Sequence, residues 1–456
     1  MGEEPPPPPD ELVRHHTGAS HKRPRTNSAS SAASAESLHS TRTLQNEDLE
    51  FIYENGRIYG NDSYFMPCDE AEQDRLALHH QIYLLALKGK LTTVKVTPAM
   101  HRILDLGTGP GHWAVAIAQQ CPWAEVVGID MAVWDIDTTE ESAGDAEVKW
   151  EIDDLDVWGV DDVVDDLSLQ LERQHLARDL SSRDPMDSPA RQRAARASPS
   201  QSSITAPQTP AESAYDLYVL NPDEQPGWHF SDTYDFIHLR GMKGAFAYWE
   251  GVYDEIYKNL APGGWIEVVD YHIELPGNDL TPSPSPSTSH PDHTNPQTDP
   301  QQQQPPAAAD DEPFPFPTLA TLHFALMQAS VKSGRSLGTF YMHPTYLTDA
   351  GFKDVSTTYV NVPVGQWPDD EHQRRIGKLF LVDVMEMLEP NLMRLLTTYG
   401  DARRIWTRDE VADAIDKGKR EILDWNRGME EKRERGERRK WEWKTSFKWM
   451  KGRKPL

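Results

Sequence analysis

Apolar and polar residues alternate along this chain with two periods, which predict helices and strands in succession. The segment 69–87 carries apolar residues at helical spacing and acids in its first turn, so it predicts a helix. The runs 103–106 and 126–129 are short and apolar and predict strands, with a helix over 113–120 between them. A first helix is therefore followed by a strand, a helix and a second strand.

The same alternation continues toward the C-terminus. The stretch 148–152 alternates like a third strand and ends in two acids, and 234–239 predicts a fourth. An amphipathic helix is expected over 248–260, ending at a Pro-Gly-Gly stop signal, and a fifth strand over 265–273. The remaining elements are expected in the order helix, strand, helices and strand: 319–333, 355–364, between 371 and 439, and 441–449.

The final strand rests on aromatic spacing. Trp441, Trp443, Phe447 and Trp449 share one parity among polar residues, whereas a basic disordered tail is the rival interpretation of the same stretch. Strands that alternate with helices predict an α/β fold, in which a mostly parallel sheet carries helices on both faces. Between 409 and 444 acids and bases alternate, which favours a solvated helix face over a nucleic-acid site.

Three segments have too little hydrophobicity and too much proline to form a core. We expect a disordered tail over 1–40 and low-complexity loops at about 160–213 and 276–311. Because the flanking segments complete one strand and helix pattern, we expect a single domain over 41–456 that these two loops interrupt.

Composition restricts the class of protein. The chain has 456 residues and a net charge of −27, which argues against direct nucleic-acid binding. Cys68 and Cys121 suggest neither a disulfide framework nor zinc, and no run is long enough to span a bilayer. We therefore expect a soluble intracellular protein. The basic cluster 21–25 is either a nuclear-import signal or simply solvated, so the predicted compartment is cytoplasmic, nuclear or both.

The glycine-rich turn after the first strand carries the candidate chemistry. Gly107, Gly109 and Gly111 alternate, whereas a dinucleotide site has two residues between its second and third glycines, and Pro110 removes a backbone donor. This favours a cofactor without phosphate, and S-adenosylmethionine fits. Asp130 ends the second strand and is expected to accept from the ribose hydroxyls. The alternative is a tight turn that merely opens an α/β domain.

An ordered series of motifs strengthens this interpretation. The chain resembles the fungal LaeA-like S-adenosylmethionine-dependent methyltransferases, within the class I methyltransferase fold. The resemblance runs from about residue 51 to the C-terminus and departs from the family after Asp130, where 131–145 is acidic. It also implies an N-terminal arm and a late helical cap. Its matching blocks are 54–59, 69–80, 103–113, 151–154, 235–240, 262–265 and 452–455.

The resemblance assigns roles around the cofactor. Tyr59 resembles part of a covering segment, and Asp153 or Asp154 is implied to accept from the adenine amino group. Each has an alternative: packing of the arm for Tyr59, and solvation at a strand end for the two acids. Asp105 is expected to orient the glycine turn or to face the methionine amine, or to cap the turn.

The catalytic residues are less determined than the cofactor site. A general base helps when the acceptor is a hydroxyl, and His238 and Asp270 are the candidates, although His238 is as readily a packed, hydrogen-bonded residue. We expect no metal site, because His79 and His80 cannot face the same way on one helix. The predicted cofactor-binding set is Tyr59, Asp105, Gly107, Thr108, Gly109, Gly111, Asp130, Met131, Asp153, Asp154 and His238.

Three functions follow from these observations. The first is an enzyme that methylates a small molecule, such as a secondary metabolite, or a protein side chain. The second, which the resemblance permits, is a nuclear regulator of secondary metabolism that binds the cofactor and acts mainly through protein partners. The third, a dinucleotide oxidoreductase, is disfavoured by the glycine spacing. No motif in the sequence identifies the methyl acceptor.

Overall fold

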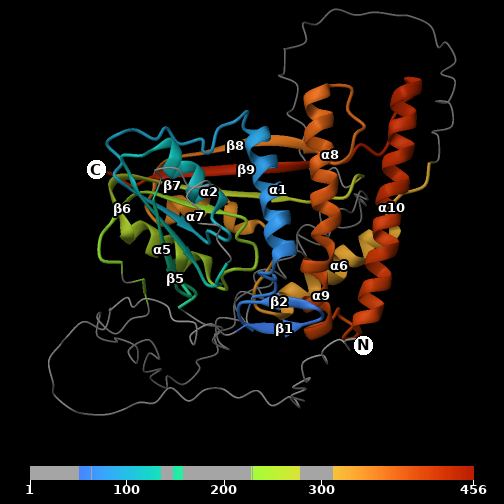
Figure 1. Cartoon of the computed structure of the whole chain (residues 1–456), viewed down its shortest axis with the longest axis horizontal. Helices are drawn as coiled ribbons and strands as arrows, with labels where there is room; N and C mark the ends of the chain where they lie inside the picture. Colours follow the sequence, from blue (N-terminus) through green and yellow to red (C-terminus); the bar gives the residue numbers. More distant parts are fainter. Residues whose placement is uncertain (1–50, 63, 135–146, 158–226, 229, 278–311) are drawn as a thin grey trace, which may run out of the picture. The chain divides into compact units, whose positions relative to one another are not determined.

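Figure 1 shows a computed structural model of the chain. The described residues all lie in one compact unit, Gln45–Leu456. The expected tail 1–40, the basic cluster 21–25 and nearly all of the loops 160–213 and 276–311 fall outside the described residues, so their boundaries stay predictions. The described residues are 51–62, 64–134, 147–157, 227–228, 230–277 and 312–456.

A seven-stranded sheet forms the centre of this unit, in the order β5-β4-β3-β6-β7-β9-β8. The five strands from β5 to β7 run parallel to their neighbours, and β9 is antiparallel to both β7 and β8. This confirms the predicted α/β class with a mostly parallel, Rossmann-like sheet. The strands are β3 Arg102–Leu106, β4 Glu125–Asp130, β5 Val148–Ile152, β6 Tyr234–Arg240, β7 Leu260–His272, β8 Lys353–Pro363 and β9 Lys444–Arg453.

Helices cover both faces of the sheet because successive strand residues point to opposite sides. Leu104 and Ile237 face a core that includes α5, whereas Ile103 and Phe236 pack against α2. The helix α1 packs with α8 on the α2 side of β7 and β9. The helices are α1 Glu70–Ala86, α2 His112–Gln120, α5 Trp249–Asn259, α6 Pro317–Lys332, the 3-10 helix η4 Phe340–Met342, α7 Pro344–Asp349, α8 Glu371–Glu386, α9 Leu388–Thr398 and α10 Arg408–Arg435.

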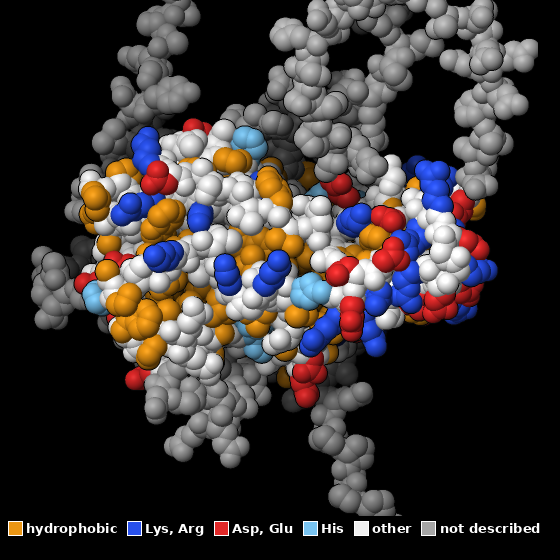
Figure 2. All heavy atoms as spheres, turned by 90° about the horizontal axis from the view of Figure 1, so that it is seen from above, with side chains coloured by type: hydrophobic (Ala, Val, Ile, Leu, Met, Phe, Trp, Pro, Cys, Tyr) orange, Lys and Arg blue, Asp and Glu red, His pale blue; other side chains and the backbone are white. Residues whose placement is uncertain are grey.

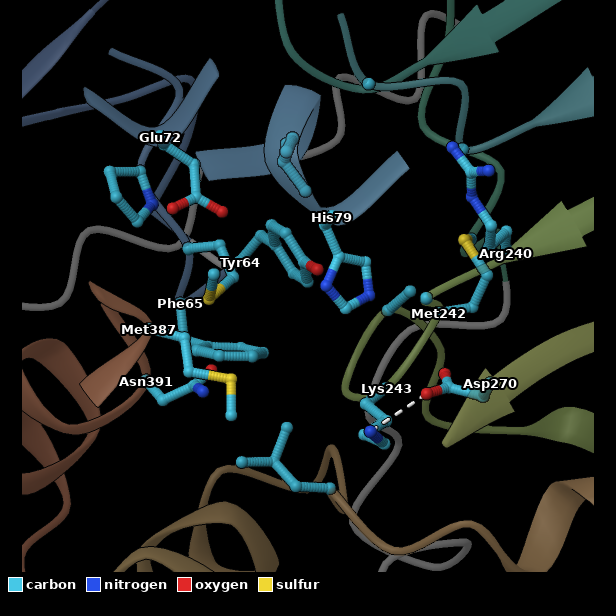
Figure 3. A pocket seen from close by; sticks show the side chains of 18 of the residues that line it. Tyr64, Phe65, Glu72, His79, Arg240, Met242, Lys243, Asp270, Met387 and Asn391 are labelled. Carbon is cyan, nitrogen blue, oxygen red and sulfur yellow. Dashed lines mark ion pairs between the residues drawn. The ribbon is translucent and has the colours of Figure 1, made fainter. Parts of the chain in front are cut away.

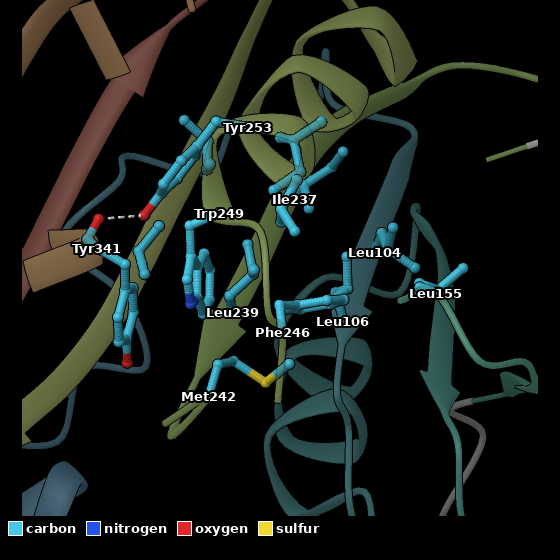
Figure 4. Close-up of a cluster of buried hydrophobic side chains, with 14 of the residues drawn as sticks. Leu104, Leu106, Leu155, Ile237, Leu239, Met242, Phe246, Trp249, Tyr253 and Tyr341 are labelled. Atoms are coloured by element: carbon cyan, nitrogen blue, oxygen red, sulfur yellow. Dashed lines mark hydrogen bonds between the residues drawn. The ribbon is translucent and has the colours of Figure 1, made fainter. Parts of the chain in front are cut away.

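The core under α5 is rich in aromatic rings (Figure 4). Trp249 stacks on Tyr341 with ring centroids 4.0 Å apart, and the Tyr253 hydroxyl donates to the Tyr341 carbonyl over 2.7 Å. Stacked aromatic pairs of this kind stabilise a core beyond their buried area. These contacts fix η4 against the sheet, close to the carboxyl ends of β6 and β7.

The C-terminal strand confirms the aromatic parity and excludes the disordered tail. Phe447 and Trp449 are at most 1% exposed in β9, between β7 and β8. The intervening lysines are ordered as well, since Lys448 donates to the Met342 carbonyl over 2.6 Å. The strand begins at Lys444, so Trp441 and Trp443 precede it.

The helix α5 agrees with the predicted helix 248–260 to within one residue at each end. The strand β7 begins earlier than the predicted strand 265–273, so the Pro-Gly-Gly sequence lies inside it, at a register shift. The pattern also missed a hairpin of β1 Ile52–Glu54 and β2 Arg57–Tyr59. Asn55 and Gly56 have φ of 54° and 81°, the positive values that a two-residue hairpin turn requires.

Acidic and basic side chains intermingle at the end of the unit where α10 lies, on the right of Figure 2. Within α10, Arg435 pairs with Glu431 at 3.7 Å, one turn away. The helix face therefore has no large patch of a single sign in this view, as the alternating charges predicted. In the described part of the chain, no helix is long and apolar enough to cross a membrane.

Candidate active site

A cavity of about 320 Å³ lies at the carboxyl ends of the parallel strands, where open α/β sheets hold their ligands. We call the side formed by 105–110, 129–132 and 153–155 the strand end. The opposite side, which we call the helical end, comes from α1, α6, α8 and α9 (Figure 3). Residues that define the helical end are Glu72, Arg75, His79, Leu319, Leu326, Val384 and Leu392.

The three glycines of the turn all have positive φ, of 69°, 55° and 79°, but their surroundings differ. A β-carbon at Gly107 would lie 2.3 Å from the Met242 sulfur, and one at Gly111 would lie 2.4 Å from the Trp150 ring. At Gly109 no neighbouring atom would lie closer than 3.9 Å. Packing therefore requires glycine at the outer two positions, whereas only Gly109 leaves room beside the cavity that it lines.

Asp130 holds the glycine turn against the end of β4. Its Oδ2 accepts from the Gly109 N–H over 2.7 Å, and its Oδ1 accepts from the Ala132 N–H over 2.9 Å. Burial raises the pKa of Asp130, although these two backbone donors oppose the rise. The expected contact of Asp130 with the ribose hydroxyls stays a prediction.

Asp105 orients the turn from below. Its Oδ2 accepts from the Thr108 hydroxyl over 2.8 Å, and its Oδ1 lies 3.0 Å from His238 Nδ1. The His238 ring is 1% exposed and stacks on Trp113 with centroids 3.7 Å apart. It does not line the cavity, which corrects the expectation that His238 contacts the cofactor or serves as the base. The packed, hydrogen-bonded alternative describes it, because Asp105 and Trp113 hold it beneath the turn.

Tyr59 requires a similar correction. Its side chain is fully buried, and the Arg394 guanidinium lies 4.1 Å from its ring centroid. It does not line the cavity, so the packing alternative holds for this residue. The next residue, Gly60, does line the cavity and is so close to Ala132 that a β-carbon would lie 2.7 Å from the Ala132 β-carbon.

The other predicted strand-end residues do converge. Met131, Asp153 and Asp154 all line the cavity. The Asp153 N–H donates to the Asp130 carbonyl over 3.1 Å, which ties the end of β5 to the end of β4. Burial raises the pKa of Asp153, and the neighbouring acid Asp154 contributes to the rise. Both acids are exposed, so the geometry does not rank them as partners for an adenine amino group.

Asp270, the other candidate base, lines the cavity but is already surrounded by donors. Lys243 Nζ lies 2.8 Å from Oδ1, the Tyr271 N–H donates to the same oxygen over 2.7 Å, and the Tyr341 hydroxyl donates to Oδ2. The Lys243 ammonium also lies 3.8 Å from the Tyr271 ring centroid. These contacts indicate that Asp270 is an anion that positions Lys243, rather than a base that takes a proton from the methyl acceptor.

The helical end contains a buried ionic network that the sequence did not predict. Arg75 donates to both oxygens of Glu72, over 3.0 and 2.6 Å, and to Asp383 Oδ1 over 2.9 Å. His79 Nδ1 lies 2.7 Å from Asp383 Oδ2. All four residues are at most 8% exposed. Although burial raises the pKa of Asp383, contacts with His79 and Arg75 leave it below its usual value.

His79 is therefore held as an oriented imidazole in the cavity. Burial lowers its pKa, and Asp383 opposes the shift only in part, so the neutral ring is favoured near neutral pH. A neutral ring that donates from Nδ1 to Asp383 presents Nε2 as an acceptor. Figure 3 shows the ring between Tyr64 and Met242.

Part of this network had a signal in the sequence. Glu72, Arg75 and His79 follow each other at three and four residues, which places them on one face of α1, and Ile82 continues that face into the core. Charged residues on an inward helix face indicate buried partners. The partner Asp383 lies 304 positions from His79, and no local pattern identifies it. No group of side chains suited to a metal ion occurs among the described residues.

Comparison with known proteins gives concordant results. A family model described as a methyltransferase domain matches residues 77–303. The chain is 26% identical to the secondary metabolism regulator LAE1 of Cochliobolus heterostrophus, over 74% of this chain and 78% of that protein. It is 24% identical to the methyltransferase pytC of Aspergillus terreus, over 84% and 85%.

A third relative is the protein-methionine methyltransferase laeA of Emericella nidulans, which is 23% identical over 75% of this chain and 65% of its own length. Among solved structures, phosphoethanolamine N-methyltransferase 2 of Haemonchus contortus, in complex with S-adenosyl-L-methionine, is 12% identical. That match covers 87% of this chain and 55% of the other, with a TM-score of 0.30. The strand order β5-β4-β3-β6-β7-β9-β8 defines the fold.

Proposed function

We propose that this chain, which is a LaeA-like S-adenosylmethionine-dependent methyltransferase, methylates a small and largely apolar acceptor that carries a hydroxyl group. The observation that carries the proposal is His79, oriented by Asp383 inside the cavity. The apolar lining of the helical end, which includes Leu319, Leu326 and Val384, supports an apolar body for the acceptor.

The strand end is proposed to hold the cofactor. Gly109 leaves space for it, Asp130 accepts from the ribose hydroxyls, and Asp153 or Asp154 accepts from the adenine amino group. Met131 lines the same side of the cavity. When bound, S-adenosylmethionine supplies a methyl group on a positively charged sulfur. The protein then has to align the acceptor and exclude water rather than activate the donor.

His79 is the proposed general base in place of His238 and Asp270. Its Nδ1–H donates to Asp383, which leaves Nε2 free to take the acceptor's hydroxyl proton as the methyl group is transferred. Its lowered pKa keeps the ring neutral, as a base must be before the reaction. A hydroxyl acceptor needs such a group, whereas an already deprotonated acceptor would not.

The test supplies S-adenosylmethionine with a labelled methyl group and uses a cell extract as the source of acceptors. Label is then measured separately in the low-molecular-mass and protein fractions. We expect label in the low-molecular-mass fraction with the natural chain, and loss of transfer in His79→Gln with unchanged affinity for S-adenosylhomocysteine. The control is His343→Gln, because His343 is exposed and lies outside the cavity. Label found only in protein would contradict the small acceptor, and full transfer by His79→Gln would contradict the base.

A second candidate function is regulation of secondary metabolism through protein partners in the nucleus. The names of the relatives LAE1 and laeA support it, since LAE1 is described as a secondary metabolism regulator. We propose that the protein occurs in the cytoplasm, the nucleus or both. Expression of Gly109→Val in cells lacking the natural protein would separate the candidates, because a regulator that acts through partners keeps its effect without the cofactor.

A further inference from the structure

Arg240 is a basic residue beside the glycine turn that none of the roles above uses. It ends β6, one position after Leu239, which pairs with Leu106 in β3. Since the glycine turn starts directly after Leu106, Arg240 lies beside its first residue, Gly107. The side chain lines the cavity. Figure 3 shows it across the cavity from Phe65, Met387 and Asn391.

The contacts of this guanidinium are neutral. Its Nη1 lies 3.1 Å from His80 Nδ1, and its central carbon lies 5.0 Å from the Tyr83 ring centroid. Among the described residues, no acidic side chain forms an ion pair with it. Burial lowers the pKa of Arg240, which Tyr83 and Asp105 oppose from a distance. A guanidinium enclosed in this way lacks the partner that normally offsets its loss of hydration.

The other cations at the cavity are already neutralised. Arg75 pairs with Glu72 and Asp383, and Lys243 pairs with Asp270. The strand end itself is lined by acids, which would repel an anionic group. An anion that enters beside the glycine turn therefore meets Arg240 as its complementary charge.

We infer that Arg240 binds the carboxylate of the methionyl group of S-adenosylmethionine. The inference rests on the proposed cofactor site and deepens it. The methionyl group carries one carboxylate and one ammonium. A planar guanidinium matches a carboxylate in charge and in two-point geometry. Asp105, directly below the turn, then remains available to the ammonium, as the sequence suggested.

The experiment compares two ligands that differ in this group. S-adenosylhomocysteine carries the carboxylate, whereas 5′-methylthioadenosine keeps the adenosine and sulfur but lacks the amino-acid part. We expect Arg240→Gln to weaken binding of S-adenosylhomocysteine by roughly tenfold to hundredfold, as loss of a charged hydrogen-bonded pair does. The same substitution should change the affinity for 5′-methylthioadenosine by less than about twofold. Titration calorimetry on the full chain measures both.

The results distinguish failure of the Arg240 assignment from failure of the cofactor site. Equal weakening of both ligands would mean that Arg240 only supports the turn, and unchanged binding of both would mean that its anion is not the cofactor carboxylate. Arg240→Lys, which keeps the charge, should recover part of the lost affinity for S-adenosylhomocysteine. If the natural chain binds neither ligand, the proposed cofactor site itself fails, which is distinguishable from failure of the Arg240 assignment.

Discussion

The two ends of the cavity are built in different ways. The strand end consists of short segments that directly follow β3, β4 and β5, and its residues are close in the chain to the strands that position them. The helical end joins α1 to α8 through Arg75 and Asp383, which are 308 positions apart. The strand end is therefore a property of local sequence and sheet order, whereas the helical end exists only once distant helices pack.

The two arginines of the cavity show the same difference. Arg75 pairs with two carboxylates, Glu72 on its own helix and Asp383, which helix packing brings to it. Arg240 contacts a neutral histidine and a tyrosine ring and lines the cavity. Removing the cation of a buried ion pair leaves its carboxylates uncompensated, whereas removing Arg240 leaves no such paired acid among the described residues.

The largest effect should come from removing the strand that both ends depend on. Truncation after Arg439 deletes β9 from between β7 and β8 and removes Phe447, Trp449 and Met450 from the core. Each aromatic ring contributes about 2 kcal/mol or more, which together exceeds much of a typical total stability. We expect loss of cooperative thermal unfolding and rapid proteolysis.

The control for this truncation removes only Leu456, which is 97% exposed. It should melt like the full chain. A truncated protein that melts normally and binds S-adenosylmethionine would show that β9 is dispensable.

A second change should affect the strand end alone. Gly109→Val places a side chain where the structure leaves room for the ligand, so affinity for S-adenosylhomocysteine should fall by roughly a hundredfold or more. Its matched control is Gly436→Val, because Gly436 ends α10 with a φ of 68° and open space around it. Calorimetry and thermal melting should show equal losses of stability but a loss of binding only at Gly109. Normal binding by Gly109→Val would show that the turn is merely structural.

A third change tests the ionic network at the helical end. Arg75→Met leaves the buried carboxylates of Glu72 and Asp383 without their cation, which should lower the free energy of unfolding by about 3–5 kcal/mol. Arg240→Met removes a guanidinium that pairs with no acid in the described part of the chain, and it should change the free energy of unfolding by less than about 1 kcal/mol. Urea denaturation without ligand measures both. Equal losses would contradict the contrast between the two arginines.

A fourth prediction concerns acid. Burial lowers the pKa of His80 to about 2, with Arg240 adding to the shift, and burial also lowers the pKa of His79. Below the ordinary value of 6.5 the unfolded chain takes up protons that the folded chain does not, so stability is lost as the pH falls. Each such histidine should lower the free energy of unfolding by about 1.4 kcal/mol per pH unit.

Urea denaturation between about pH 6.5 and pH 5 measures this slope. His80→Gln should flatten it relative to the natural chain, because glutamine takes up no proton. An equal slope in the two proteins would show that His80 is protonated in the folded state.

The smallest effect is expected at Asp130. Asp130→Ala should weaken binding of S-adenosylhomocysteine by roughly tenfold, because the ribose hydroxyls lose their acceptor. Loss of the Gly109 and Ala132 hydrogen bonds should add a modest decrease in melting temperature. Unchanged affinity in a folded Asp130→Ala protein would remove the ribose assignment while leaving the role in holding the turn.

Most of the sheet could be predicted because its strands are short apolar runs with clear ends. The predicted strand 148–152 coincides with β5, and the aromatic parity predicted β9 in spite of its lysines. The hairpin of β1 and β2 was missed because each strand has three residues, too few to show a period. The Pro-Gly-Gly signal gave the end of α5 correctly but hid the start of β7, because proline and glycine there form an irregularity within the strand.

The predicted site residues also include some that the structure brings together and one that it does not. Gly109, Asp130, Asp153 and Asp154 converge as the sequence implied, because parallel strands bring their carboxyl ends to one edge. His238 ends up beneath the turn, because the alternation of β6 points it to the same face as Trp113. The face on which a strand residue lies thus decides whether it can reach the cavity.

By itself, the sequence determined the α/β class, the glycine turn with its acid, and the cofactor that such a turn suits. These depend on hydrophobic period, backbone freedom at glycine and the position of a strand end, all of which are local. Only the tertiary structure decided that Asp383 orients His79 and pairs with Arg75, and that Arg240 has no acidic partner among the described residues. The partner Asp383 lies hundreds of positions from Arg75 and His79, and burial makes such a partner decisive.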